Sequence, residues 1–176
     1  MRTFKGSVGV FDSSFVVFIK GDGGRIKLDA NVLSKISKYI QVEKNMSEAG
    51  GVLLGRYIID SKDIVVDDVT TPMKNDVRQR CYFIKIKSNH QRIVTRRWNK
   101  SKGTCNYLGE WHTHPEAVPT PSSIDISEWK RQLRSSKFED DCLYFIIAGT
   151  QKIRVWEGNK NSLEIKLLEK YSEGGD

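Results

Sequence analysis

The feature that most restricts how this chain folds is an alternation of short apolar runs with segments of helical periodicity. Three segments carry apolar residues at steps of three and four, which predicts helices at about residues 29–44, 88–99 and 122–136. The apolar runs have the length of strands, and they are GGVLLGRYIID, KDIVVDDVT, CYFIKI, NYLGEWHTH, CLYFIIAG, KIRVWEG and SLEIKLLEK. This order predicts an α/β (α+β) fold in which one central mixed sheet, containing these strands, is flanked by helices.

Polar residues mark where these elements begin. Asp29, Ser88 and Ser122 each stand at the start of a predicted helix, and their side chains can accept hydrogen bonds from its first turn. In the first twenty residues, Asp12-Ser13-Ser14 separates two apolar stretches, which predicts a hairpin of two short strands. His90 falls in the second predicted helix, among basic residues, and we expect it on the surface.

The length of 176 residues suits one domain. We expect residues 1–170 to form it, with a core at about 45–150, and residues 171–176 to be a flexible tail. With 38% hydrophobic and 29% charged residues the composition is that of a soluble globular protein, and no apolar run approaches the ~20 residues of a membrane-spanning helix. We therefore expect no membrane contact and a cytoplasmic location, in which the 3 cysteines stay reduced.

Basic residues outnumber acidic ones, with 29 Lys and Arg against 22 Asp and Glu, for a formal charge of +7. Part of the excess lies in residues 90–102, HQRIVTRRWNKSK, where cations flank Trp98. This pattern is typical of the solvated face of a helix, but a nucleic-acid contact through Arg92, Arg96 and Arg97 would use the same residues. Because the chain has no nucleic-acid-binding signature, we expect a solvated surface and no nucleic acid partner.

Two histidines carry the strongest functional signal. His112 and His114 are two residues apart on a predicted strand, so their side chains point to the same face. Pro115 begins the loop PEAVPTP, Ser122 opens the next helix, and Asp125 lies in its first turn, where the carboxylate can turn back toward the end of the strand. Two imidazoles and one carboxylate leave a fourth tetrahedral position open, as in catalytic zinc sites. The spacing predicts one zinc ion per chain and a hydrolytic reaction.

A hydrolase of this kind also needs a carboxylate that carries protons near the metal. Glu48 is our first candidate, because it directly precedes GGVLLG, whose glycines allow close backbone approach and whose apolar residues indicate a buried strand. Glu110 is an alternative proton carrier, or a partner of a metal ligand, because it stands two residues before His112 and shares its face.

These residues resemble the motif of a known family. The order Glu48, His112-Thr113-His114, PEAVPTP, Ser122, two further residues and Asp125 is similar at every position to the JAMM motif of the MPN+ metalloproteases. The flank EAGGVLLG resembles the segment around the catalytic glutamate of that family, particularly in its short bacterial Prok-JAB branch. The resemblance covers about residues 50–149 and, more loosely, the preceding helix.

The resemblance implies a fold and a role for each residue of the motif. The fold would be a single MPN/JAB-type domain. His112, His114 and Asp125 would bind the zinc ion, and Glu48, which ranks above the alternative carboxylate because the family glutamate comes from the earlier strand, would be the general acid and base. The hydroxyl of Ser122 would stabilise the oxyanion.

The resemblance also implies a substrate class, namely a peptide or isopeptide bond after the C-terminal glycine of ubiquitin or a ubiquitin-like protein. In size and general sequence the chain is similar to the deconjugases of bacterial CBASS anti-phage operons. That similarity implies a substrate in which the C-terminal tail of a cGAS-like nucleotidyltransferase is joined to a target protein. Processing of a sulfur-carrier ubiquitin-like protein is one alternative. A non-catalytic MPN interaction module is another, but such modules lack the metal ligands that this chain has.

Overall fold

A nine-stranded mixed sheet runs through the computed structural model, which describes residues 13–172. Its strands are β1 (Phe15–Ile19), β2 (Arg25–Asp29), β3 (Gly50–Tyr57), β4 (Ile64–Val69), β7 (Asn106–Thr113), β8 (Cys142–Ala148), β9 (Ile153–Asn159), β10 (Ile165–Leu167) and β11 (Glu169–Lys170). The order across the sheet is β10-β9-β8-β7-β3-β4-β2-β1-β11. The pairs β2–β4 and β7–β8 are parallel, and the other pairs are antiparallel. The predicted fold class is confirmed.

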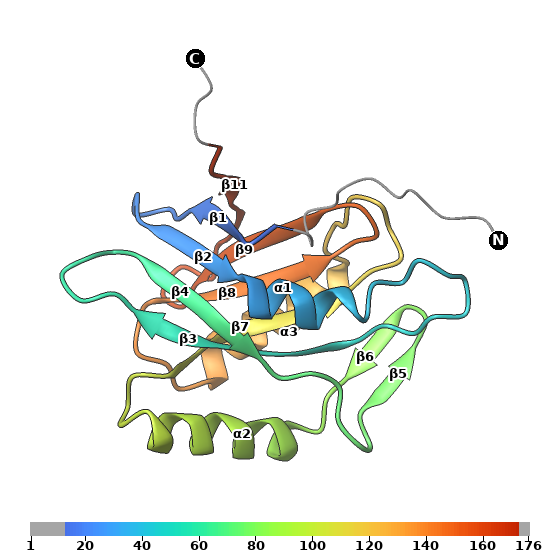
Figure 1. Cartoon of the computed structure of the whole chain (residues 1–176), viewed down its shortest axis with the longest axis horizontal. Helices are drawn as coiled ribbons and strands as arrows, with labels where there is room; N and C mark the ends of the chain where they lie inside the picture. Colours follow the sequence, from blue (N-terminus) through green and yellow to red (C-terminus); the bar gives the residue numbers. More distant parts are fainter. Residues whose placement is uncertain (1–12, 173–176) are drawn as a thin grey trace.

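Helices cover both faces of this sheet (Figure 1). Helix α1 (Ala30–Ser37) lies on one face, and α2 (Lys87–Lys100) and α3 (Ser123–Ser135) lie on the other. Strand β8 packs against both layers, because Tyr144 and Ile146 join the cluster under α1 while Phe145 and Ile147 join the cluster around Trp129 of α3. The run CLYFIIA is therefore buried almost throughout. None of the helices between residues 13 and 172 is long and apolar enough to cross a membrane.

The first two helices differ from their predicted bounds. The helix expected at 29–44 ends at Ser37, because the chain then turns so that Gln41 enters the core, where it is only 2% exposed. Asp29 occupies the N-cap position of α1 without a side-chain capping bond. The N-cap position of α2 belongs to the residue before Lys87, so the prediction that Ser88 caps this helix is wrong.

Two strands also differ from the prediction. CYFIKI does not join the central sheet, since β6 (Tyr82–Ile84) pairs with β5 (Val77–Gln79) in a separate hairpin. Strand β1 pairs with β2, a strand that we did not predict. The sequence of β2 gives a weak signal, because only Ile26 and Leu28 are apolar and buried, and Leu28 also fits the helical period that follows. The first strand of the expected N-terminal hairpin and the end of the expected tail fall outside the described residues.

His90 is buried, so the prediction of a surface position is wrong. Its side chain is 1% exposed, and its ring nitrogens lie 2.6 Å from Thr70 Oγ1 and 3.0 Å from Asp76 Oδ2. Asp76 also accepts a hydrogen bond of 2.7 Å from the N–H of Ile86. This network fixes the start of α2 and the base of the β5–β6 hairpin against the end of β4.

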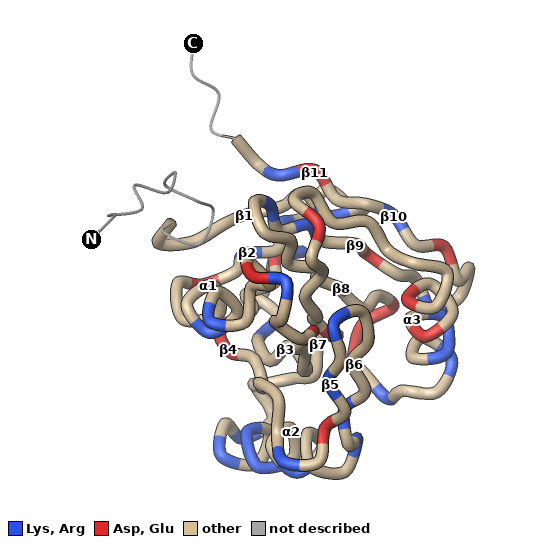
Figure 2. The backbone as a smooth tube through the Cα atoms, turned by 90° about the vertical axis from the view of Figure 1, so that its right-hand side faces the viewer, with Lys and Arg blue, Asp and Glu red and all other residues tan. Residues whose placement is uncertain are grey.

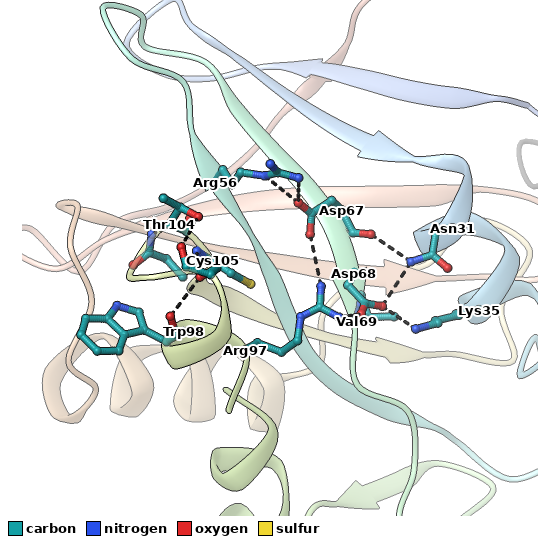
Figure 3. Close-up of polar contacts among 12 residues, drawn as sticks. Asn31, Lys35, Arg56, Asp67, Asp68, Val69, Arg97, Trp98, Thr104 and Cys105 are labelled. Carbon is teal, nitrogen blue, oxygen red and sulfur yellow. Dashed lines mark hydrogen bonds and ion pairs between the residues drawn. The ribbon is translucent and has the colours of Figure 1, made fainter. Parts of the chain in front are cut away.

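Ion pairs fasten the other half of α2 (Figure 3). Arg97 donates to Asp68 of β4 at 2.7 Å, and Asp68 also accepts hydrogen bonds from Asn31 and Lys35 of α1. The remaining cations of the helix lie on its outer side, and Figure 2 shows Lys and Arg along α2 without an intervening Asp or Glu. Arg97 is thus the basic residue that the helix uses for its own attachment.

Candidate metal centre

His112 and His114 lie at the C-terminal end of β7, with their side chains on one face of the strand. Because β7 pairs with β3 on one side and β8 on the other, its path is fixed from both directions. The two Nε2 atoms lie 3.0 Å apart. Thr113, between them, is fully buried, and the ring of His112 packs beside Trp129 of α3 with a centroid distance of 6.3 Å. The strand therefore presents both imidazoles to the same point.

Asp125 reaches this point from the first turn of α3. Ser122 is the N-cap residue, and the two residues form a capping box, in which Ser122 Oγ accepts the Asp125 N–H at 3.1 Å and Asp125 Oδ2 accepts the Ser122 N–H at 2.6 Å. The carboxylate oxygens lie 3.3 Å from His112 Nε2 and 3.4 Å from His114 Nε2. Burial acts to raise the pKa of Asp125, but hydrogen bonds from the histidines and Ser122 hold it well below its usual range.

This donor set fits a zinc ion. The ligand atoms of His112, His114 and Asp125 all lie within 4.8 Å of one another. Ligand atoms around one tetrahedral zinc, at ~2.0–2.2 Å from the ion, are about 3.4 Å apart. The separations of 3.0, 3.3 and 3.4 Å found here are close to that value. Across residues 13–172 no other group of His, Cys, Asp or Glu converges in this way.

Glu48 lies directly before β3 and faces the histidines. Its side chain is buried, and Oε1 lies 3.9 Å from His114 Nε2. Burial raises the pKa of Glu48 to about 7, although the charge of His114 acts in the opposite direction. Its N–H donates to Gln79 O at 2.7 Å and its carbonyl accepts from Arg78 Nε at 2.8 Å, so the β5 strand holds its backbone. A carboxyl with a near-neutral pKa beside the ligand cluster is suited to exchanging protons.

The side chain of Ser122 is exposed to the cleft, whereas that of Glu110 is held by two neighbouring side chains. Ser122 is exposed at the cleft, with Oγ 2.7 Å from Asp125 Oδ2. Glu110 shares the face of His112, but its carboxylate is held by Lys85 Nζ at 2.6 Å and by the hydroxyl of Tyr107 at 3.3 Å. Because Glu110 is already paired with Lys85 and Tyr107 while Glu48 faces His114, the geometry favours Glu48 over Glu110 as the candidate proton carrier.

The site opens into a cleft with a volume of about 590 Å³. The β5–β6 hairpin forms one wall, α3 forms the other, and β7 forms the floor. Its lining combines apolar side chains, among them Phe83, Ile84 and Ile124, with charged ones, among them Lys85 and Arg131. A cleft of this shape suits an extended peptide.

Reasoning from the sequence missed three residues that support the site. Gln41, which we placed in a helix, accepts a hydrogen bond from Thr113 at 3.0 Å. The one sequence signal for this role is that an amide residue stands at the end of an apolar helical pattern. Glu116 Oε2 lies 3.8 Å from His114 Nδ1, and its place just after the histidines was a weaker signal. Nothing in the sequence pattern indicates the role of Lys85.

Comparison with known proteins gives a consistent result. Residues 29–159 match the family model described as "Prokaryotic homologs of the JAB domain". A Pseudomonas aeruginosa protein named CD-NTase/cGAS isopeptidase is 39% identical over 144 residues, which cover 82% of this chain and 83% of the relative. Relatives with the same name from Vibrio cholerae and Escherichia coli are 34% identical over 140 residues and 32% identical over 155 residues. Those alignments cover 80% and 88% of this chain, and 85% and 94% of the relatives.

Proposed function

The chain belongs to the Prok-JAB family, the prokaryotic homologues of the JAB domain, and on this basis we propose that it is a zinc-dependent isopeptidase acting in bacterial CBASS anti-phage defence. The observation that carries the proposal is the convergence of two histidines and an aspartate beside a buried glutamate, at the head of a cleft. We place the enzyme in the cytoplasm.

His112, His114 and Asp125 would hold one zinc ion per chain. When bound, zinc supplies a Lewis acid that polarises the carbonyl of the scissile bond and makes water a stronger nucleophile at neutral pH. The strand, paired on both sides, and the capped first turn of α3 hold these side chains in position. Little reorganisation of the chain is therefore needed for binding.

Glu48 would move the protons of the reaction. In its ionised form its carboxylate accepts a proton from the attacking water, and in its protonated form it donates that proton to the leaving amine. Burial raises the pKa of Glu48 to about 7, which makes its protonated form easier to reach than that of an exposed glutamate, and a bound cation would act in the opposite direction. Its burial excludes competing water, which strengthens its interactions with the groups it faces.

Ser122 would stabilise the negative charge that develops on the carbonyl oxygen. Its hydroxyl lies at the cleft surface beside Asp125. The Asp125 carboxylate also accepts the backbone N–H of Ser122 at 2.6 Å, so the helix keeps a capping bond when the hydroxyl turns toward substrate. A cap and an oxyanion donor are thus compatible in one residue.

The proposed substrate is the C-terminal tail of a cGAS-like nucleotidyltransferase joined to an amine of a target protein. The names of the three relatives support a nucleotidyltransferase tail over a ubiquitin-like protein as the modifier. The position of the site within a cleft supports a tail rather than a folded surface as the part that enters it.

The test uses such a tail joined to a reporter protein, once as a linear fusion and once through a lysine side chain. Wild-type protein with zinc should release the reporter with a cut directly after the tail, as measured by mass spectrometry. Glu48→Gln should not, while Glu43→Gln, which changes an exposed glutamate of the same segment, should cleave like wild type. Cleavage of a sulfur-carrier tail in preference to the nucleotidyltransferase tail would reassign the substrate. Equal activity of Glu48→Gln and wild type would overturn the mechanism.

A further inference from the structure

The side chain of Gln41 is a buried polar group whose oxygen and two N–H donors all have hydrogen-bond partners. It is 2% exposed and follows α1 at the point where the chain leaves the helix. Its Oε1 accepts from Thr113 Oγ1 at 3.0 Å, and its Nε2 donates to Met46 O at 3.1 Å and to Arg80 O at 2.7 Å. A primary amide has two N–H donors, and both have partners here.

The three partners belong to the three segments that build the site. Thr113 stands between the two histidines on β7. Met46 lies two residues before Glu48 in the segment that leads into β3. Arg80 follows β5 in the turn of the hairpin that forms one wall of the cleft. A single side chain therefore joins the metal-binding strand, the segment of the proton carrier and the cleft wall.

Further bonds make this junction continuous. The Thr113 hydroxyl also accepts the N–H of Ala49 at 3.0 Å, and the N–H of Thr113 donates to Ala49 O at 2.9 Å. The N–H of Glu48 donates to Gln79 O at 2.7 Å on the hairpin side. The segment that carries Glu48 is thus hydrogen-bonded to β7 on one side and to β5 on the other. Gln41 bonds to Thr113 of β7 and to Arg80, which directly follows β5.

We propose that Gln41 is a positioning residue, which sets the carboxylate of Glu48 relative to the two histidines and holds the cleft wall at the same time. This inference rests on the proposed function. An apolar side chain would fill the same space without the free-energy cost that a buried amide pays whenever one of its hydrogen-bond partners is missing. An amide bonded to three segments fixes their spacing, which a methyl group cannot do. Misplacement of a reacting group by about 1 Å can lower the rate about 10²-fold.

The first test is Gln41→Leu, which keeps the volume and removes the bonds. With the tail-reporter substrate we expect kcat to fall about 10–100-fold while zinc stays at one per chain. The matched control is Ile64→Ala, which opens a cavity at a buried position (1% exposed) where β4 pairs with the far end of β3. It should lower the melting temperature at least as much as Gln41→Leu does, and leave kcat near wild type below that temperature.

Variants of Thr113 test the same junction from the other side. Thr113→Ser keeps the hydroxyl and should retain most of kcat, whereas Thr113→Val should lose it to the same extent as Gln41→Leu. The double variant Gln41→Leu/Thr113→Val should be little worse than either single variant, because both remove one network. If the two losses multiply, or if Thr113→Ser is as impaired as Thr113→Val, the junction is not what positions the site.

Hydrogen exchange gives a readout that does not need a substrate. The amides of Glu48 and Ala49 should exchange at least tenfold faster in Gln41→Leu than in wild type, and faster than in Ile64→Ala, which is destabilised at least as much. If Gln41→Leu exchanges faster but the wild-type protein cleaves no tail, the structural role of Gln41 stands and the proposed function is rejected. Unchanged exchange, or a loss of kcat no larger than in Ile64→Ala, would overturn the positioning role.

Discussion

The carboxylate of Glu48 lies 3.9 Å from the Nε2 atom of His114, although β4, the β5–β6 hairpin and α2 separate the two residues in the sequence. The pairing of β3 with β7, in which Gly50 stands opposite His112, produces this approach. The backbone ladder between β3 and β7 therefore brings Glu48 close to the histidines.

We predict one zinc ion per chain, held by His112, His114 and Asp125. Elemental analysis should find about one equivalent in wild type and almost none in the double variant His112→Ala/His114→Ala. Asp125→Asn should lower the affinity for zinc, because an amide oxygen is a weaker ligand than a carboxylate. Asp141→Asn changes an aspartate away from the site that is 61% exposed, and it should bind zinc like wild type. Full zinc content in the double variant would refute this ligand set.

Removing the carboxylate of Glu48 should abolish turnover without removing the metal. We expect Glu48→Gln to keep zinc and to lose about 10²–10⁴-fold in kcat, the usual contribution of a general acid–base group. Glu110→Gln should lose far less, because Glu110 is paired with Lys85 and not with a metal ligand. The opposite ranking of the two variants in steady-state assays would make Glu110 the proton carrier.

The ionisation of Glu48 predicts how activity depends on pH. The base must be deprotonated to accept a proton from water, so kcat/KM should fall as the pH drops through its pKa. Burial raises that pKa to about 7 in the metal-free protein, and a bound cation lowers it because it favours the charged form. A carboxyl-detected NMR titration should show a pKa near 7 without metal and a lower value with zinc. A metal-free pKa near 4.5, the ordinary value for glutamate, would contradict the effect of burial.

Ser122 should show two separable effects. Ser122→Ala removes a hydroxyl that caps α3, which we expect to cost about 0.5–2 kcal/mol of unfolding free energy. It also removes the proposed oxyanion donor, which we expect to lower kcat about 10²–10³-fold. Ser88→Ala, at a serine that is not the cap of α2, should change neither quantity. A lower melting temperature with normal kcat would leave Ser122 as a helix cap alone.

The tail of the substrate should end in a small residue. Phe83 and Ile124 line the cleft together with the two histidines, so we expect a bulky side chain at the cleaved position to collide with the cleft walls. We expect cleavage of a glycine-ended tail, from both a linear fusion and an isopeptide, and little cleavage when that glycine is replaced by phenylalanine. Equal rates for the two tails would describe a less selective peptidase.

The elements with strong periodicity were predictable from the sequence. The helix that begins after Ser122 and the strand ending in the two histidines have the expected positions, because capping chemistry and the two-residue period are local rules. The convergence of Asp125 on the histidines followed from those two elements and a loop of known length.

What could not be predicted depends on contacts between distant segments. Gln41 leaves a helical pattern because its amide finds partners on β7 and in the hairpin, which no local rule reveals. His90 is buried because Thr70 and Asp76 satisfy its ring nitrogens from another part of the chain. The β5–β6 hairpin departs from the central sheet for a similar reason, since its partner strand is only three residues long and carries little pattern.

The order of strands in the sheet also bears on the tendency of the protein to aggregate at high concentration. Within residues 13–172 the edge strands of the nine-stranded sheet, β10 and β11, contain three and two residues, so these two strands offer a second chain little backbone on which to add. The most apolar run, CLYFIIA, lies in β8, away from both edges and covered on both faces. Fibril growth should therefore begin from unfolded chains that release this segment, and conditions that slow unfolding should delay aggregation more than dilution of the native protein does.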